Sequence, residues 1–285
     1  MGKFSIKTKL IILIVLVCGC IFLINNSTYA ASSNFNILHY QRNLFINKQN
    51  ENGLRDGVIK LPLINKSGST AYWYTSNSKV ATVNQFGYVT GINPGYAKIT
   101  AYTANGYSDS CDVYVRYDGT KIVATANKFK GYTGRQMFNL FKQRTGNGFY
   151  EEWCALFVSY VYDLNNAVRS YKNLDQYAWS VSYFTELPNY KSKAKYPNYI
   201  PKKGDLIIFD NTEDKNYAYD HVGMVTSYNA KYKIIYAIEG NIRGGGEKYS
   251  TIVGYDQYYN SVPYRRVNGK QNMEIRGFLS LNNGL

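Results

Sequence analysis

Between Gly57 and Arg116 the sequence repeats one pattern, in which short alternating runs of apolar and polar residues are interrupted by turn-forming residues. The interruptions recur about every eight to twelve residues, as in all-β domains. In a strand, neighbouring side chains point to opposite faces, so alternation lets each run bury one face. The pattern predicts a β-sandwich with Trp73 packed between its sheets and Cys111 as a buried thiol.

Several motifs make this segment resemble the bacterial immunoglobulin-like group 2 family over about residues 37–116. They are Trp73, Ser76-Asn77, Val80-Ala81-Thr82-Val83, Gly87-Tyr88-Val89-Thr90-Gly91, Pro94-Gly95 and Ala97-Lys98-Ile99-Thr100-Ala101. The resemblance implies an Ig-like sandwich that serves as a surface spacer or adhesive unit. We expect this domain to span residues 31–117.

The N-terminus has the features of an export signal. Three lysines precede an uninterrupted apolar run over 10–24, and Thr28-Tyr29-Ala30 places small residues before a possible cleavage site. The run is shorter than the roughly 20 residues that span a bilayer. We therefore predict a signal peptide over 1–30 that is cleaved to give a secreted, extracellular or wall-associated protein without membrane contact. An uncleaved N-terminal anchor is the alternative.

Charge restricts the partners only weakly. The chain has 33 Lys and Arg against 19 Asp and Glu, and because the signal holds three lysines and no acid, cleavage lowers the net charge from +14 to +11. The basic residues are scattered, whereas a nucleic-acid module would concentrate them, so we expect no nucleic-acid partner. Contact with anionic wall polymers and a merely solvated basic surface both remain open.

After residue 117 the pattern changes from strands alone to helix followed by strands. Residues 122–126 and the segment beginning at Cys154 are expected to be helical, the second with one apolar face formed by Leu156, Phe157, Tyr160 and Val161. Apolar strands are expected at 206–209, 222–227, 234–239 and 275–279. Helices first and antiparallel strands after them indicate an α+β domain, which we place at 118–285.

Few residues of the chain can form a cysteine–histidine pair. Signal cleavage would leave Cys111 and Cys154 as the cysteines, and the chain has only two histidines, His39 and His221. Cys154 follows Glu151-Glu152 at a helix start, where free backbone N–H groups favour a thiolate. Taken alone, however, a cysteine on an apolar helix is more often a core residue.

The other candidates lie at strand ends. His221 stands between Asp220 and an apolar strand, where a structural role is as plausible as a catalytic one. Glu239 and Asn241 are two residues apart, so a regular strand would point both to one face. Presented together, a carboxylate and an amide can orient an imidazole and polarise a carbonyl.

The order of these pieces resembles the cysteine, histidine-dependent amidohydrolase/peptidase family, known as CHAP, over about residues 120–282. The motifs are Trp153-Cys154-Ala155-Leu156-Phe157, Gly204-Asp205, Asp220-His221-Val222-Gly223 and Glu239-Gly240-Asn241. The resemblance implies a papain-like fold with Cys154 as nucleophile, His221 as general base and then acid, and Glu239 as the group that holds the imidazole. Asn241 would support the same side of the site, and it is the alternative partner of His221.

The resemblance further implies a secreted peptidoglycan hydrolase, either an N-acetylmuramoyl-L-alanine amidase or an endopeptidase, acting as a monomer on the cell wall without a cofactor. Some CHAP enzymes carry an acidic calcium loop before the nucleophile, but residues 134–150 hold no Asp or Glu, so we predict no metal. The related NlpC/P60 peptidases usually have a second histidine where this chain has Glu239, which disfavours them. A non-catalytic surface-binding or adhesion protein is the rival interpretation.

Overall fold

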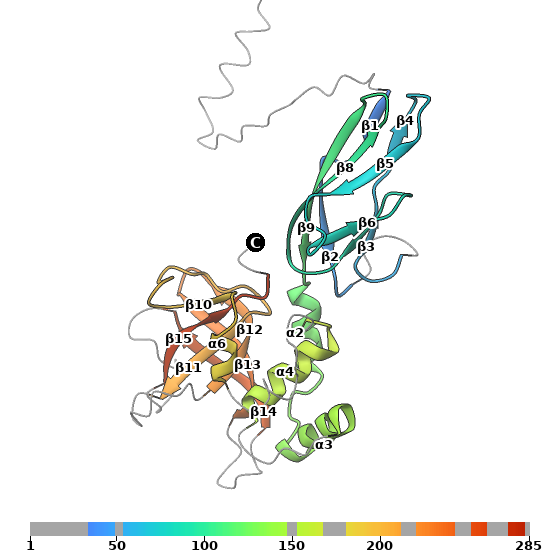
Figure 1. Cartoon of the computed structure of the whole chain (residues 1–285). Helices are drawn as coiled ribbons and strands as arrows, with labels where there is room; N and C mark the ends of the chain where they lie inside the picture. The colour runs from blue at the N-terminus through green and yellow to red at the C-terminus, as the bar shows by residue number, and fades with distance from the viewer. Residues whose placement is uncertain are drawn as a thin grey trace, which may run out of the picture. The chain divides into compact units, whose positions relative to one another are not determined.

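The computed structural model describes residues 34–48, 54–146, 153–167, 181–211, 221–242, 252–260 and 273–282 (Figure 1). The predicted signal peptide, 1–30, lies outside these ranges. The strands of the Ig-like region come first in the chain, and the helices and a second large sheet follow.

The Ig-like region is built from nine strands in the described residues. They are β1 (Phe35–Ile37), β2 (Gln41–Phe45), β3 (Val58–Lys60), β4 (Leu63–Asn65), β5 (Ala71–Thr75), β6 (Ala81–Val83), β7 (Tyr88–Gly91), β8 (Gly95–Thr103) and β9 (Ser108–Arg116). One sheet has the order β2-β9-β8-β5, a second has the order β3-β7-β6, and β1 pairs with β4. All pairings are antiparallel except β2 with β9, which is parallel.

The core of this region follows the predicted alternation. Ala97, Ile99 and Ala101 on β8 are fully buried, and so are Cys111 and Val113 on β9. Antiparallel pairing places Ile99 directly opposite Cys111 and Ala97 opposite Val113. The sequence pattern therefore identified the buried face of both long strands.

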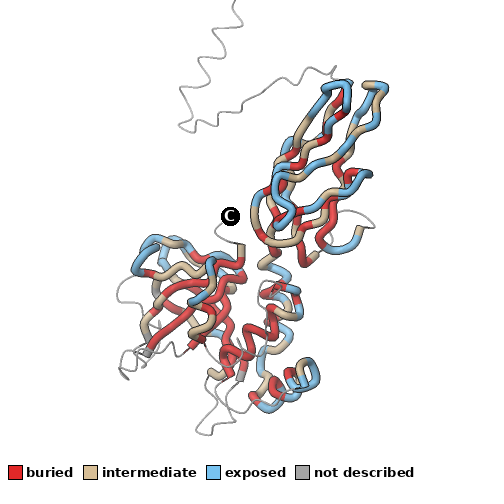
Figure 2. Tube along the Cα trace, in the orientation of Figure 1, coloured by how far each residue is buried: buried red, intermediate tan, exposed pale blue. Residues whose placement is uncertain are grey.

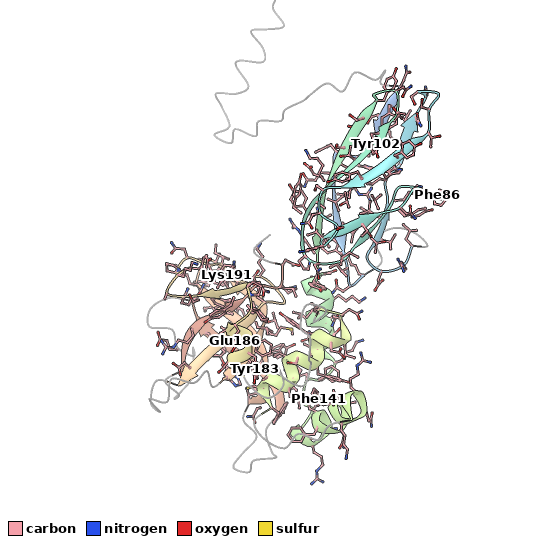
Figure 3. All side chains as sticks on the ribbon, in the orientation of Figure 1. Phe86, Tyr102, Phe141, Tyr183, Glu186 and Lys191 are labelled. Atoms are coloured by element: carbon pink, nitrogen blue, oxygen red, sulfur yellow. The ribbon has the colours of Figure 1, made fainter. Side chains whose placement is uncertain are left out.

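Trp73 differs from its prediction. It lies on the edge strand β5, where it is half-buried and packs against the core rather than being enclosed by it. The outer surface carries other aromatic side chains, among them those of Phe86 and Tyr102 (Figure 3). The indole of Trp73 lies against Gly87, just before β7 of the other sheet, where an added Cβ would be 2.7 Å from Trp73 Cζ2.

The second region has helices followed by strands, as expected. The helices are α2 (Gly119–Asn127), α3 (Gly134–Thr145), α4 (Cys154–Leu164) and α6 (Ser182–Thr185). The strands are β10 (Tyr190–Ser192), β11 (Leu206–Asn211), β12 (His221–Asn229), β13 (Ile234–Ile242), β14 (Ile252–Tyr259) and β15 (Met273–Leu279). They form one antiparallel sheet in the order β10-β15-β11-β12-β13-β14.

Helix α4 is the most buried helix of this region. Every residue from Cys154 to Tyr162 is buried, and the helix packs against β12 and β13 (Figure 2). The sequence predicted one apolar face for this helix, whereas the helix is buried on all its faces. A helix that is apolar all round is covered on all sides, which holds its first residue in a fixed place.

Helix α3 and strand β14 were not predicted. Helix α3 is polar on average, but Thr133 and Gln136 form a capping box at its start and Gly146 ends it. Its buried Met137, Phe138 and Phe141 recur at helical spacing, which was a further sequence signal. In β14, Gly254 and Asp256 interrupt the apolar pattern, so strand periodicity is weak. Among the helices of the described ranges, none has the length and apolar character to cross a membrane.

Candidate active site

The site begins with a pair on adjacent strands. His221 opens β12, Glu239 lies near the end of β13, and the antiparallel pairing of these strands brings the two together. The imidazole Nε2 is 2.7 Å from Glu239 Oε2. An ionised carboxylate can only accept, so the ring nitrogen donates this bond. The His221 side chain is 10% exposed and that of Glu239 is fully buried, so water does not screen the pair.

Cys154 occupies the first position of α4, and its side chain is the second partner of His221. The Cys154 thiol is hydrogen-bonded to the His221 side chain. Because Nε2 faces Glu239, the ring nitrogen that remains for Cys154 is Nδ1. The three side chains therefore form a row in the order thiol, imidazole, carboxylate. They come from α4, β12 and β13, respectively.

The electrostatics of this row favour a charged imidazole. Burial by itself lowers the pKa of His221, but the negative charge of Cys154, the hydrogen bonds with Cys154 and Glu239, and the Glu239 carboxylate raise it, from 6.5 to about 10. The raised pKa keeps the His221 ring an imidazolium at neutral pH, and Cys154 is one of its hydrogen-bond partners. An imidazolium beside a cysteine side chain is the arrangement that can activate a cysteine as a nucleophile.

Two glycines let these groups approach one another. A Cβ atom on Gly240 would lie 2.7 Å from Phe157 Cβ and 2.8 Å from Trp153 Cζ3, so only glycine lets the start of α4 rest on β13. A Cβ on Gly223 would lie 2.6 Å from Glu239 Cγ. The glycines of the two motifs are therefore explained by close packing at the site.

Comparison with known families agrees with this arrangement. The model of the CHAP domain matches residues 144–241, a range that contains Cys154, His221 and Glu239. The model of the bacterial Ig-like domain (group 2) matches residues 58–113. The chain joins an Ig-like domain to a CHAP domain. Both resemblances noted in the sequence are thereby confirmed.

Similarity to individual proteins is limited. Lacto-N-biosidase of Bifidobacterium bifidum is 40% identical over 78 residues, which is 22% of this chain and 7% of that protein, so the chain spans a small part of this relative. The crystal structure of an intimin mutant of EHEC O157:H7 covers 50% of this chain and 70% of its own, at 18% identity and a TM-score of 0.21. Neither likeness bears on the CHAP chemistry.

Asn241 of the CHAP domain has an unexpected backbone. Its φ is +60°, in the left-handed region, and the register between β13 and β14 shifts between Glu239 and Ile242. A β-bulge interrupts the alternation of side chains, so the argument that places Glu239 and Asn241 on one face does not hold here. The Glu239 carboxylate is the group at hydrogen-bonding distance on Nε2.

The Gly204-Asp205 motif of the CHAP domain is structural. The buried Asp205 carboxylate accepts hydrogen bonds from the backbone N–H of Lys202 and of Leu281 and from the Tyr199 hydroxyl, each 2.8 Å long. The Tyr162 hydroxyl, on α4, donates to the Gly204 carbonyl at 2.7 Å. These bonds fix the turn before β11 to α4 and to the end of β15.

Sequence reasoning missed Tyr258 on β14. Its hydroxyl donates to Glu239 Oε2 at 3.0 Å, and the residue is fully buried. No motif points to it, because a tyrosine in a chain with 30 of them gives no specific signal. Glu151, Glu152 and Asp220, which the sequence also placed around the site, lie outside the described residues.

Within the described ranges, no group of three or more His, Cys, Asp and Glu side chains is placed to hold a metal ion. The second cysteine, Cys111, is fully buried in the Ig-like core, and burial raises the pKa of its thiol to about 12. A thiol of this kind stays protonated and inert at neutral pH. Cys154 is therefore the cysteine with a partner that can activate it.

Proposed function

We propose that this protein is a peptidoglycan hydrolase that cuts amide bonds with Cys154 as its nucleophile. The match to the CHAP domain suggests hydrolysis of peptidoglycan. The observation that carries the cysteine mechanism is the buried row in which His221 is hydrogen-bonded to Cys154 on one side and to Glu239 on the other. A purely adhesive protein has no need of such a row, which disfavours the rival function.

The reaction follows from the order of these groups. The Cys154 thiolate attacks the carbonyl carbon of the amide, and the oxyanion that forms is stabilised by backbone N–H groups at the start of α4. The His221 imidazolium gives its proton to the nitrogen of the leaving amine as the C–N bond breaks. Neutral His221 then takes a proton from water, which attacks the thioester and releases the acid and the thiolate.

Glu239 and Asn241 have supporting roles in this proposal. Glu239 fixes the imidazole orientation and balances its positive charge through both half-reactions. Asn241, two residues further along the chain, has its supporting role from the CHAP resemblance alone, because the bulge removes the argument from strand alternation. The α4 helix followed by an antiparallel sheet fits a papain-like arrangement of nucleophile and base.

We further propose that residues 1–30 are a signal peptide removed on export. The mature protein would then be extracellular or wall-associated and monomeric, with the Ig-like domain (31–117) acting as a spacer for the CHAP domain (118–285). The net charge of +11 that remains suits contact with anionic wall polymers. No metal or cofactor is needed for the chemistry proposed.

Digestion of isolated peptidoglycan tests the function and names the bond. Wild-type protein and the Cys154→Ala variant are incubated with it, and the released fragments are identified by mass spectrometry. Free N-terminal L-alanine on stem peptides would indicate an amidase, and new amines within the stem or cross-bridge would indicate an endopeptidase. Equal, negligible release by both proteins would leave the binding function as the better account.

A further inference from the structure

Tyr258 shares one carboxylate oxygen with the histidine of the site. Its hydroxyl lies 3.0 Å from Glu239 Oε2, the same atom that accepts the 2.7 Å hydrogen bond from His221 Nε2. The other oxygen, Oε1, is buried and has no hydrogen-bond partner among the described residues. Both bonds that hold this carboxylate therefore end on the oxygen that faces the imidazole.

The Tyr258 ring is fixed independently of its hydroxyl. It lies 4.4 Å from the ring of Phe209, which in turn lies 5.8 Å from the imidazole of His221. Tyr258, Phe209 and Glu239 are fully buried. The hydroxyl is thus presented to Glu239 by a rigid aromatic stack that also borders His221.

We propose that Tyr258 is a positioning residue of the active site, which keeps Glu239 Oε2 directed at His221 so that the imidazole stays aligned with Cys154. Without the hydroxyl, a buried carboxylate with one remaining hydrogen bond is free to rotate away from the ring. Of the described groups around the imidazole, α4 contributes Cys154, β13 contributes Glu239, β11 contributes the uncharged Phe209, and β14 acts through Tyr258. This inference rests on the proposed function only where it predicts an effect on catalysis. The predicted effect on the His221 titration does not depend on that function.

The test is the Tyr258→Phe variant, which removes the hydroxyl and keeps the ring that packs on Phe209. The full chain has only two histidines, so the ring signals of His39 and His221 can both be followed by NMR with labelled histidine. We expect the titration midpoint of His221 to fall by about one pH unit, because a less firmly held carboxylate stabilises the imidazolium less. An unchanged or higher midpoint would overturn the inference.

Kinetics give a second readout. We expect kcat on peptidoglycan to fall about 10-fold, the usual scale for a lost hydrogen bond to a charged group, with KM within about twofold. Tyr255→Phe is the matched control, since Tyr255 lies on the same strand but donates to Asn127 Oδ1 at 2.6 Å; it should leave both readouts unchanged. A rise in KM alone, with kcat unchanged, would contradict a positioning role.

A double-mutant comparison separates positioning from a general effect on the fold. If Tyr258 acts through Glu239, adding Tyr258→Phe to a Glu239→Gln protein should change the His221 midpoint much less than it does in the wild type. Equal shifts in the two backgrounds would overturn the inference. The NMR readout does not require activity, so a protein that fails to digest peptidoglycan would refute the proposed function while leaving this test valid.

Discussion

His221 Nε2 and Glu239 Oε2 are 2.7 Å apart, and they join the first residue of β12 to the end of β13 at a largely buried position. This contact decides which ring nitrogen is left for Cys154. It also places a compensating negative charge beside the imidazolium that the reaction needs. The proposed chemistry depends on this alignment.

Replacing Glu239 with glutamine keeps the shape of the side chain and removes its charge. We expect kcat to fall by at least about 100-fold, because the imidazolium loses its partner and the amide can present the wrong group to the ring. Steady-state kinetics on soluble peptidoglycan fragments measure the change. Glu274→Gln, at a partly exposed carboxylate on β15 that pairs with Arg276, is the control and should keep wild-type kcat. Similar kinetics in the two variants would rule out the role given to Glu239.

The raised pKa of His221 makes the stability of the protein depend on pH. Its pKa is about 10 in the folded protein against 6.5 in the unfolded chain, so its stabilising contribution is complete below about pH 6.5 and is lost as pH rises through about 10. Urea unfolding at pH 6, 8 and 10 should therefore show a falling free energy of unfolding. The His221→Gln variant should lose most of this slope. An identical slope in both proteins would mean that His221 is not charged at neutral pH.

The two cysteines of the described residues should differ sharply in alkylation. With its pKa raised to about 12, Cys111 would be thiolate in only about one molecule in 10,000 at pH 8, whereas Cys154 is paired with an imidazolium. Brief treatment of native protein with iodoacetamide, followed by peptide mapping, should find label at Cys154 and none at Cys111. In denaturant both should react. Preferential labelling of Cys111 in native protein would contradict an activated Cys154.

Gly223 should not tolerate even a methyl group. A Cβ there would lie 2.6 Å from Cγ of the fully buried Glu239, so the Glu239 side chain would have to shift out of its alignment with His221. We expect Gly223→Ala to lower kcat about 10-fold or more and to destabilise the fold by about 1–3 kcal/mol, as overpacking does. Gly254→Ala is the control, because its Cβ would meet only the flexible end of Ile242. Kinetics and thermal melting of the pair measure both effects, and an equal loss in the two would argue against a specific clash.

The parts of the fold that follow regular periodicity could be predicted from the sequence. The alternation over 97–101 and 111–115 identified the buried faces of β8 and β9, and the apolar runs identified β11, β12, β13 and β15. Helix α3 was missed because its apolar face, which buries Met137, Phe138 and Phe141, is short and lies among polar residues that dominate the segment. Strand β14 was missed because Gly254 and Asp256 interrupt its alternation.

The residues of the site also divide into those that the sequence could predict and those that it could not. Cys154, His221 and Glu239 stand in motifs whose order carries the information, and the structure brings these three side chains together. Asn241 lies at a bulge, which two-residue spacing cannot reveal. Tyr258 reaches Glu239 only through the pairing of β13 with β14, a long-range contact that leaves no local mark in the sequence.

The most direct test of a cysteine-dependent amide hydrolase is the number of new amino groups released from purified peptidoglycan per molecule of protein, since each hydrolysed amide yields one. Wild-type protein, Cys154→Ala and Cys111→Ala are compared at equal concentration after each is shown to be folded. We predict many amino groups per molecule for wild type and Cys111→Ala and none above background for Cys154→Ala. Equal release by wild type and Cys154→Ala would contradict Cys154 as the nucleophile.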